Sequence, residues 1–377
     1  MHVETNSEQF AILFSVGRLQ SRSLAMLNFK ANSACILPMR SSLNCQLLIP
    51  DLFWSSGNEA GRKQGFPALC TLLGRANSAR GRAQDMEEWL CRAFAVNKQQ
   101  DWPVAALTLV SDGGSPDDEY WLRADPVYLR LDSGQLLLAD TRSFAITAEE
   151  ADRLTQSLNS HFSGAGMLFY VLHPERWYLR VAIPPQLQTR LLAEVVGKNI
   201  DEFLPVGKDS IYWHGVYNEI QMVLHDHAVN EAREAAGNPP VNSVWLWGGG
   251  RLPDVVKKPY AHVWTDECLA KGLALASGAG ISSLPQNAQA WLAQTPAAGA
   301  HLLILDSLRA AAQYRDRARW LEDIQQLEIR WFAPLLTALQ RGEIQELTIS
   351  SGAWSFIVAR ADLWKLWRRS TAFADYA

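Results

Sequence analysis

The 377-residue chain has few cysteines, and their arrangement excludes two kinds of site. The five cysteines are scattered, odd in number and never spaced as CxxC. A disulfide framework needs an even set at regular spacings, and a structural zinc site needs paired ligands. We therefore expect neither, and we expect a reduced, cytoplasmic protein.

The sequence also lacks a long apolar run and an excess of basic residues. No run approaches the roughly 20 apolar residues that cross a bilayer. A signal peptide is not expected, because Glu4 and Glu8 stand where such a peptide carries Lys or Arg. The net charge is −4, so the chain as a whole offers no basic surface for nucleic-acid phosphates. These absences predict a protein that binds neither membranes nor nucleic acid.

Local signatures of catalysis are absent as well. The chain has no convincing GxSxG, Ser-His-Asp or Cys-His set. His225 and His227 are two residues apart, so on a helix they point about 200° apart and cannot share a metal ion. His227 falls on an apolar stripe, which is typical of a core histidine.

Apolar periodicity predicts an α/β fold. The runs CQLLIP, SVWLW, HLLIL and QELTIS are typical of buried strands, and helical patterns separate them. A long helix is expected over about 210–236, and Pro334 should kink a helix over 317–341. Alternating strands and helices predict a mainly parallel sheet sandwiched by helices.

The period changes at Tyr120, which indicates a second structural unit. YWLRADPVYLRL and ERWYLRVAI alternate like strands with one solvated face, and Thr147 with Glu150 forms a capping box for the helix between them. We expect a small inserted α+β subdomain. The 1–44 segment is either a poorly ordered extension or the product of a start codon placed too early. The predicted organisation is an N-terminal extension 1–44, the first part of the core 45–118, the insertion 119–209, and the long helix with the second part of the core 210–377.

The stretch HDHAVNEAREAAGNPPVNSVWLWGGGRLP, residues 225–253, contains the residue types of a ligand pocket. Gly248, Gly249 and Gly250 follow an apolar strand, and they indicate either a structural turn or a ligand-binding loop. Exposed N–H groups there, together with Arg251, would suit an anion. Arg123 and Arg180 lie in the alternating strands, where each either grips a phosphate or carboxylate or belongs to a solvated face.

The same stretch resembles a segment of archaeal-type cofactor-independent phosphoglycerate mutases of the alkaline-phosphatase-like superfamily. That segment reads H-P-V-N, an Arg three residues on, then P-A-N, an apolar strand and G-x-G. The resemblance spans about 45–360, and it implies an alkaline-phosphatase-like core. LLIPDLF resembles the first strand of these enzymes, which ends in a metal-binding Asp, here Asp51. The whole chain is also similar to the RpfE-type regulatory protein family through its W-L-R-A-D-P, H-x-V-N and S-V-W-L-W-G-G-G segments. The ligand-binding residues that the resemblance and the stretch imply are Arg123, Arg180, His227, Asn230, Arg233, Asn242, Gly248, Gly249, Gly250 and Arg251.

Departures from the mutase pattern concern the reacting groups. These enzymes use two divalent metal ions and a serine that takes the phosphoryl group. Asp85 stands near the expected position of that serine, and Arg309 and Gln313 match the family's D-x-x-x-H. Ser350 and Ser351 replace its D-H pair. Only Asp51 remains of the metal-ligand set, and one carboxylate does not hold a dinuclear site.

These observations favour a catalytically degenerate, regulatory pseudoenzyme that binds a small phosphorylated or anionic metabolite and needs no cofactor. One alternative is an active phosphomutase or phosphatase that uses Mn or Mg held by relocated ligands, with Asp85, Asp306, Asp316 and His301 as the substitutes. A second alternative is a scaffold that binds a protein partner through a surface rich in the 15 tryptophans.

Overall fold

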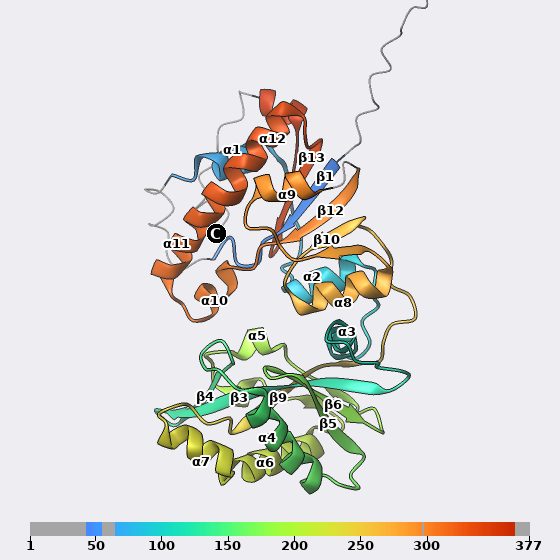
Figure 1. Ribbon diagram of the computed structural model, residues 1–377, viewed down its shortest axis with the longest axis vertical. Coiled ribbons are helices and arrows are strands. Elements are labelled where there is room, and N and C mark those ends of the chain that lie inside the picture. Colours follow the sequence, from blue (N-terminus) through green and yellow to red (C-terminus); the bar gives the residue numbers. More distant parts are fainter. Residues whose placement is uncertain (1–42, 55–64, 296–297, 366–377) are drawn as a thin grey trace, which may run out of the picture. The chain divides into compact units, whose positions relative to one another are not determined.

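The computed structural model describes residues 43–54, 65–295 and 298–365, and these residues form two main sheets with helices packed on them (Figure 1). They belong to one compact unit. The predicted extension 1–44 lies outside the described residues except for Leu43 and Asn44, which begin the first strand of the larger sheet.

The larger sheet has seven strands in the order β11-β10-β12-β1-β13-β14-β2. Its first five strands run parallel, whereas β14 is antiparallel to both β13 and β2. The predicted mainly parallel sheet is therefore confirmed. Its strands are β1 (Leu43–Leu48), β2 (Asn77–Arg80), β10 (His262–Trp264), β11 (Gly280–Ser282), β12 (Gly299–Ile304), β13 (Glu346–Ser351) and β14 (Trp354–Ala359).

Both faces of this sheet are buried because successive side chains of its central strands enter different cores. Leu47 packs in one apolar cluster with α1, α11 and α12, and Leu48 packs in another with α2, α3 and α8. A strand buried on both faces reads as a continuous apolar run, which is the pattern of Leu302 to Ile304 in β12. The helices on the two faces are α1 (Pro67–Arg75), α2 (Met86–Ala93), α3 (Val104–Ser111), α8 (Cys268–Ser277), α9 (Ala288–Gln294), α10 (Leu308–Gln313), α11 (Arg317–Leu327) and α12 (Ala333–Arg341).

The smaller sheet has five antiparallel strands, in the order β4-β3-β6-β5, and β9 also pairs with β3 along residues 121–127. Figure 1 shows α4, α6 and α7 over one face of it, and α3 contacts β3 and β9. Its elements are β3 (Tyr120–Asp132), β4 (Gln135–Ala139), α4 (Ala148–His161), β5 (Met167–His173), β6 (Arg176–Val181), α6 (Ser210–His225), α7 (Ala228–Ala235) and β9 (Ser243–Gly250). Short elements complete the chain: β7 (Leu187–Gln188), α5 (Leu192–Val195), β8 (Val206–Gly207), and 3-10 turns at Ile200–Glu202 and Arg360–Trp364.

Three details differ from the sequence-based expectation. The SVWLW strand, β9, belongs to the smaller sheet, so elements of that sheet continue to residue 250, and the domain boundary at 209 stays a prediction. The expected helix over 210–236 is two helices, because His227 caps the second one by accepting from the Val229 N–H at 3.1 Å. Residues 120–127 of β3 are buried on both faces instead of having a solvated one.

One local prediction is confirmed, and the kink expected at Pro334 stays a prediction although the helix is interrupted near it. The capping box of Thr147 and Glu150 is present at the start of α4. A π-helical turn, Glu328–Phe332, interrupts the 317–341 helix directly before Pro334. The Glu328 carboxylate accepts from the Ala68 and Leu69 N–H groups at 2.6 and 3.0 Å, and so caps α1 from a distant part of the chain.

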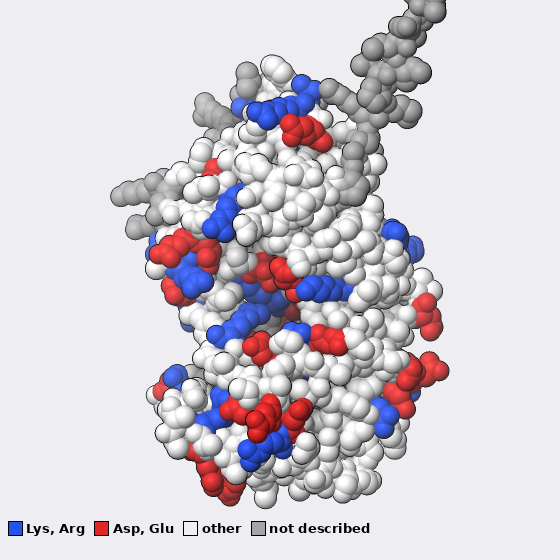
Figure 2. All heavy atoms as spheres, viewed as in Figure 1, with Lys and Arg blue, Asp and Glu red and all other residues white. Residues whose placement is uncertain are grey.

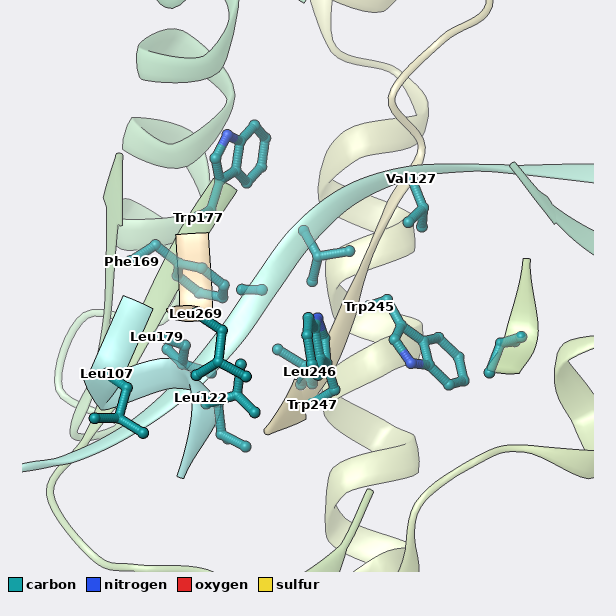
Figure 3. Packing of buried hydrophobic residues seen from close by; sticks show 14 of the residues in the cluster. Leu107, Leu122, Val127, Phe169, Trp177, Leu179, Trp245, Leu246, Trp247 and Leu269 are labelled. Carbon is teal, nitrogen blue, oxygen red and sulfur yellow. The ribbon is translucent and has the colours of Figure 1, made fainter. Parts of the chain in front are cut away.

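The interior of the smaller sheet is built from large aromatic and aliphatic side chains (Figure 3). Trp177 and Trp245 are fully buried, and each indole N–H donates to a backbone carbonyl, that of Pro174 and of Arg190 respectively. The same apolar cluster continues through α3 and α8 to Leu302 of the larger sheet. In the part of the chain described, no helix is both long and apolar enough to cross a bilayer.

Candidate functional site

A charged cavity of about 340 Å³ lies among the ends of α3, α8 and α10 and the strands β3 and β6. Figure 2 shows acidic and basic side chains crowded side by side around a hollow on this face. Seven acidic and five basic residues contribute to the lining, so the charges of the wall do not cancel. The charged lining residues are Glu87, Asp112, Asp125, Asp140, Glu175, Asp266 and Glu267, with Arg123, Arg142, Arg176, Lys271 and Arg309.

Arg123 forms the buried wall of the cavity. Its guanidinium donates to Asp125 Oδ1 at 2.5 and 3.1 Å, and it lies over the Tyr178 and Trp247 rings. Burial alone would lower the pKa of Arg123, but the Asp125 carboxylate raises it. The Trp247 indole donates to the other Asp125 oxygen at 2.7 Å. Arg123 therefore keeps its charge, and hydrogen bonds hold both Arg123 and its partner Asp125 in place.

Arg176, at the start of β6, forms a two-bond ion pair with Asp112 at 2.9 and 2.7 Å. The Tyr178 hydroxyl donates to the same carboxylate at 2.6 Å. Burial would raise the pKa of Asp112, but these hydrogen bonds and the Arg176 charge outweigh burial and lower it. The Cys268 thiol lies 3.6 Å from Asp112, and burial raises its pKa to about 11.

Arg309, on α10, is the cation of a buried acidic cluster. It pairs with Glu87 of α2, whose side chain is 6% exposed. Burial would lower the pKa of Arg309, but the charges of Glu87, Glu267 and Asp51 raise it. Glu267 caps α8 by accepting from the Leu269 and Ala270 N–H groups at 3.0 and 2.7 Å, and burial raises its pKa. The positive charge of one guanidinium thus interacts with several carboxylates.

Asp51 and Asp85 share a smaller pocket with Arg309. Asp51 follows β1 in the left-handed conformation, with φ of 58°, and Asp85 precedes α2. The pKa of Asp51 is raised by the protein that surrounds it and by Glu87 and Asp85, while Arg309 lowers it. The predicted metal-site aspartate and the residue at the predicted nucleophile position therefore lie together.

This acidic pocket does not fit a divalent metal centre. The fixed positive charge of Arg309 already stands among the carboxylates and would repel a second cation. Within the described ranges, no group of three or more His, Cys, Asp or Glu side chains is arranged to hold a metal ion. The proposed substitute ligands are not gathered either: His301 stacks with Trp264 in an apolar cluster, and Asp316 caps α11. Asp306 is exposed before α10 and lines neither pocket.

Asn230, Asn242 and His227 of the 225–253 stretch use their polar atoms within the smaller sheet and its helices. Asn230 donates to the Leu224 and Val241 carbonyls and accepts from the Val241 N–H. Asn242 exchanges two hydrogen bonds with Leu129, at 2.8 and 2.9 Å. His227 contacts Ser157 at 3.0 Å.

Arg233 completes this group by binding Glu150 and the carbonyls of Ala145 and Pro239. None of these four residues lines the charged cavity. Their contacts give them a structural role, and ligand binding by them stays a prediction.

The three glycines permit close packing against α3 and β3. A Cβ atom at Gly248 would lie 2.9 Å from the Val104 Cβ, and one at Gly250 would lie 2.7 Å from the Pro103 Cβ. Gly248 also has a φ of +64°, which favours glycine. Its N–H donates to the Thr189 hydroxyl at 3.1 Å, so it is not directed at a ligand.

Arg180 and Arg251 line a different pocket, beside Trp121 and Tyr170. Arg180 and Arg176 are four residues apart on β6, so both side chains lie on one face, but only Arg176 reaches the charged cavity. Among the predicted ligand-binding residues, Arg123 alone lines that cavity.

Several cavity residues were missed by the sequence-based prediction. Asp266 and Glu267 follow the strand HVW after one residue, at the strand end where ligands of parallel sheets bind, so the sequence did contain a signal for them. Asp112 and Glu87 carry no comparable signal, because each is one polar residue beside or within an ordinary helix.

Part of this chain is similar in sequence to known proteins. The 2,3-bisphosphoglycerate-independent phosphoglycerate mutase of Methanosarcina mazei is 30% identical over 120 residues, which are 31% of this chain and 30% of the mutase. The Methanosarcina barkeri enzyme is 28% identical over 110 residues, 29% of this chain and 28% of the enzyme. The chain is similar to cofactor-independent phosphoglycerate mutases. The matched segments span less than a third of the length of these two relatives.

The similarity in fold to a solved structure covers more of the chain than the similarity in sequence does. The PH0037 protein of Pyrococcus horikoshii superposes with a TM-score of 0.53 at 14% identity, covering 85% of this chain and 88% of that one. At this identity the likeness concerns the fold alone. No family model matches this chain.

Proposed function

We propose that this mutase-like chain is a catalytically degenerate, regulatory protein of the cytoplasm, in keeping with its resemblance to the RpfE-type family. It binds a small phosphorylated or anionic metabolite in the charged cavity. The observation that carries the proposal is the position of Arg309, which shares a pocket with Asp51 and Asp85 and pairs with Glu87. A guanidinium cannot accept a phosphoryl group or polarise a metal-bound water, so the chemistry of a two-metal mechanism has no counterpart there.

The cavity wall supports binding of the anion. Arg176 presents a guanidinium held in place by Asp112, and such preorganised guanidinium groups bind phosphate and carboxylate through two bonds. Lys271 is the least tightly paired cation, 4.0 Å from the exposed Asp266, so its ammonium group is free to turn toward a ligand. Arg142 is 40% exposed at the side chain and lines the same cavity.

Isothermal titration of the full chain with 2-phosphoglycerate, 3-phosphoglycerate and inorganic phosphate tests the proposal, with Mn²⁺ and with chelator. We expect at least one phosphate compound to bind with equal affinity under both conditions. Lys271→Gln should weaken that affinity about tenfold through loss of a charge-assisted hydrogen bond. Arg130→Gln is the matched control, because Arg130 pairs with the exposed Asp132 and does not line the cavity.

A coupled mutase assay on the same samples distinguishes the active alternative. Turnover that requires Mn²⁺ or Mg²⁺ and disappears in Asp85→Asn would establish a working phosphomutase. It would contradict the regulatory proposal.

A further inference from the structure

Glu87 has one carboxylate oxygen that no protein group satisfies. Its Oε1 pairs with Arg309, whereas Oε2 is buried and has no hydrogen-bond partner within the described residues. The residue is only 5% exposed, and it lines the charged cavity. A buried carboxylate oxygen without a donor costs more than a neutral acceptor in the same position.

The charge around this oxygen favours a cationic donor. Arg309 is shared by Glu87, Glu267 and Asp51, so the carboxylates outnumber the guanidinium. The whole lining has seven acids against five bases. A ligand that carries only negative charge would add to this excess, whereas a ligand with an ammonium group beside its anionic group would reduce it.

We propose that the cavity binds a zwitterionic ligand, a small phosphate or carboxylate that also carries an amine. This inference rests on the proposed function and names its ligand class. The ammonium group donates to Glu87 Oε2, and the anionic group contacts Lys271 and Arg176. A hydroxyl can also donate to a carboxylate, but only an ammonium group brings a positive charge to an acid-rich site, so an amine is preferred over a hydroxyl at this position. The cavity volume of about 340 Å³ accommodates a ligand of this size.

The test compares two ligands that differ only in this group, 2-aminoethyl phosphate and 2-hydroxyethyl phosphate, by isothermal titration against the full chain. We expect the amine to bind about tenfold more tightly or better. Glu87→Gln should abolish that preference. Glu88→Gln is the matched control, because Glu88 is the next residue of α2, pairs with Arg92 and does not line the cavity.

The preference is a ratio measured within one protein, so a general loss of stability in Glu87→Gln does not change it. Far-ultraviolet circular dichroism identifies a variant that has not folded, and Glu87→Asp, which keeps the charge and withdraws it by one methylene, then takes its place with a reduced preference expected. Equal affinity for both ligands in the wild type, or a preference that survives Glu87→Gln, would overturn the zwitterion inference and leave the proposed function standing. Binding of neither ligand, with no binding of inorganic phosphate, would overturn the proposed function and this inference together.

Discussion

The close packing of α8 against α3 leads to a stability prediction. Gly272 of α8 faces α3, and a Cβ atom built there would lie 2.0 Å from the Leu107 carbonyl oxygen. That oxygen belongs to the backbone, so no side-chain rotation relieves the overlap. The helices would have to separate by roughly 1 Å, because non-bonded carbon contacts are favourable only near 3.5 Å.

Gly272→Ala combines two opposing effects. Alanine favours a helix interior by about 1 kcal/mol over glycine, and overpacking of this kind costs about 1–3 kcal/mol or more. Because the overlap involves backbone on both sides, we expect the upper part of that range and a net loss of about 2 kcal/mol in the free energy of unfolding.

Gly215→Ala in α6 is the matched control. No atom lies within 4 Å of the Cβ position there, so only the helix preference acts, and stability should rise by about 0.5–1 kcal/mol. Urea unfolding followed by tryptophan fluorescence measures both variants. If Gly272→Ala were as stable as Gly215→Ala, the close packing of α3 on α8 would be refuted.

Three further predictions concern single polar groups. Asn230→Ala should lower the free energy of unfolding by about 2 kcal/mol, because three hydrogen bonds to buried backbone are lost. The same variant should bind phosphate with unchanged affinity in titration, and a large loss of affinity would assign Asn230 to the ligand site. Glu328→Ala removes the cap of α1 and should cost about 1–3 kcal/mol in urea unfolding, whereas Glu322→Ala, on the preceding helix, should have little effect. The pKa of Asp112 is lowered in the folded protein, so the unfolded chain binds a proton at this carboxylate first as the pH falls. The stability that Asp112 contributes is therefore complete at neutral pH and should be lost below about pH 4. In urea unfolding, the wild type and Asp112→Asn should converge in that range.

The sequence predicts most of the larger sheet because its signals are local. In the run HLLIL, Leu302 and Ile304 enter one core and the two leucines that follow them enter the other, so five residues already indicate a strand buried on both faces. The position of β9 is not visible in this way. A strand buried on both faces reads the same in a parallel and in an antiparallel sheet, so SVWLW indicated a strand but not its partner.

The charged cavity is harder to predict for a related reason. Asp112 and Arg176 are 64 residues apart in the chain, and their pairing depends on the packing of α3 against the smaller sheet. Polar residues such as Asn230 and Arg233 look like ligand contacts in a sequence, because a side chain that binds backbone and one that binds a metabolite use the same chemistry. Only the geometry separates the two uses.

The pairing of β1 also affects how the protein folds during its synthesis. Both neighbours of this strand, β12 and β13, come from the last third of the chain, at residues 299–304 and 346–351. During synthesis, the two edges of β1 therefore stay without their native partners until residues 299–304 and 346–351 have left the ribosome. Topologies of this kind fold slowly, and unpaired strand edges associate with other chains. Nascent chains stalled before residue 299 should accordingly depend on chaperones, while the strands of the smaller sheet, all complete by residue 250, can already pair.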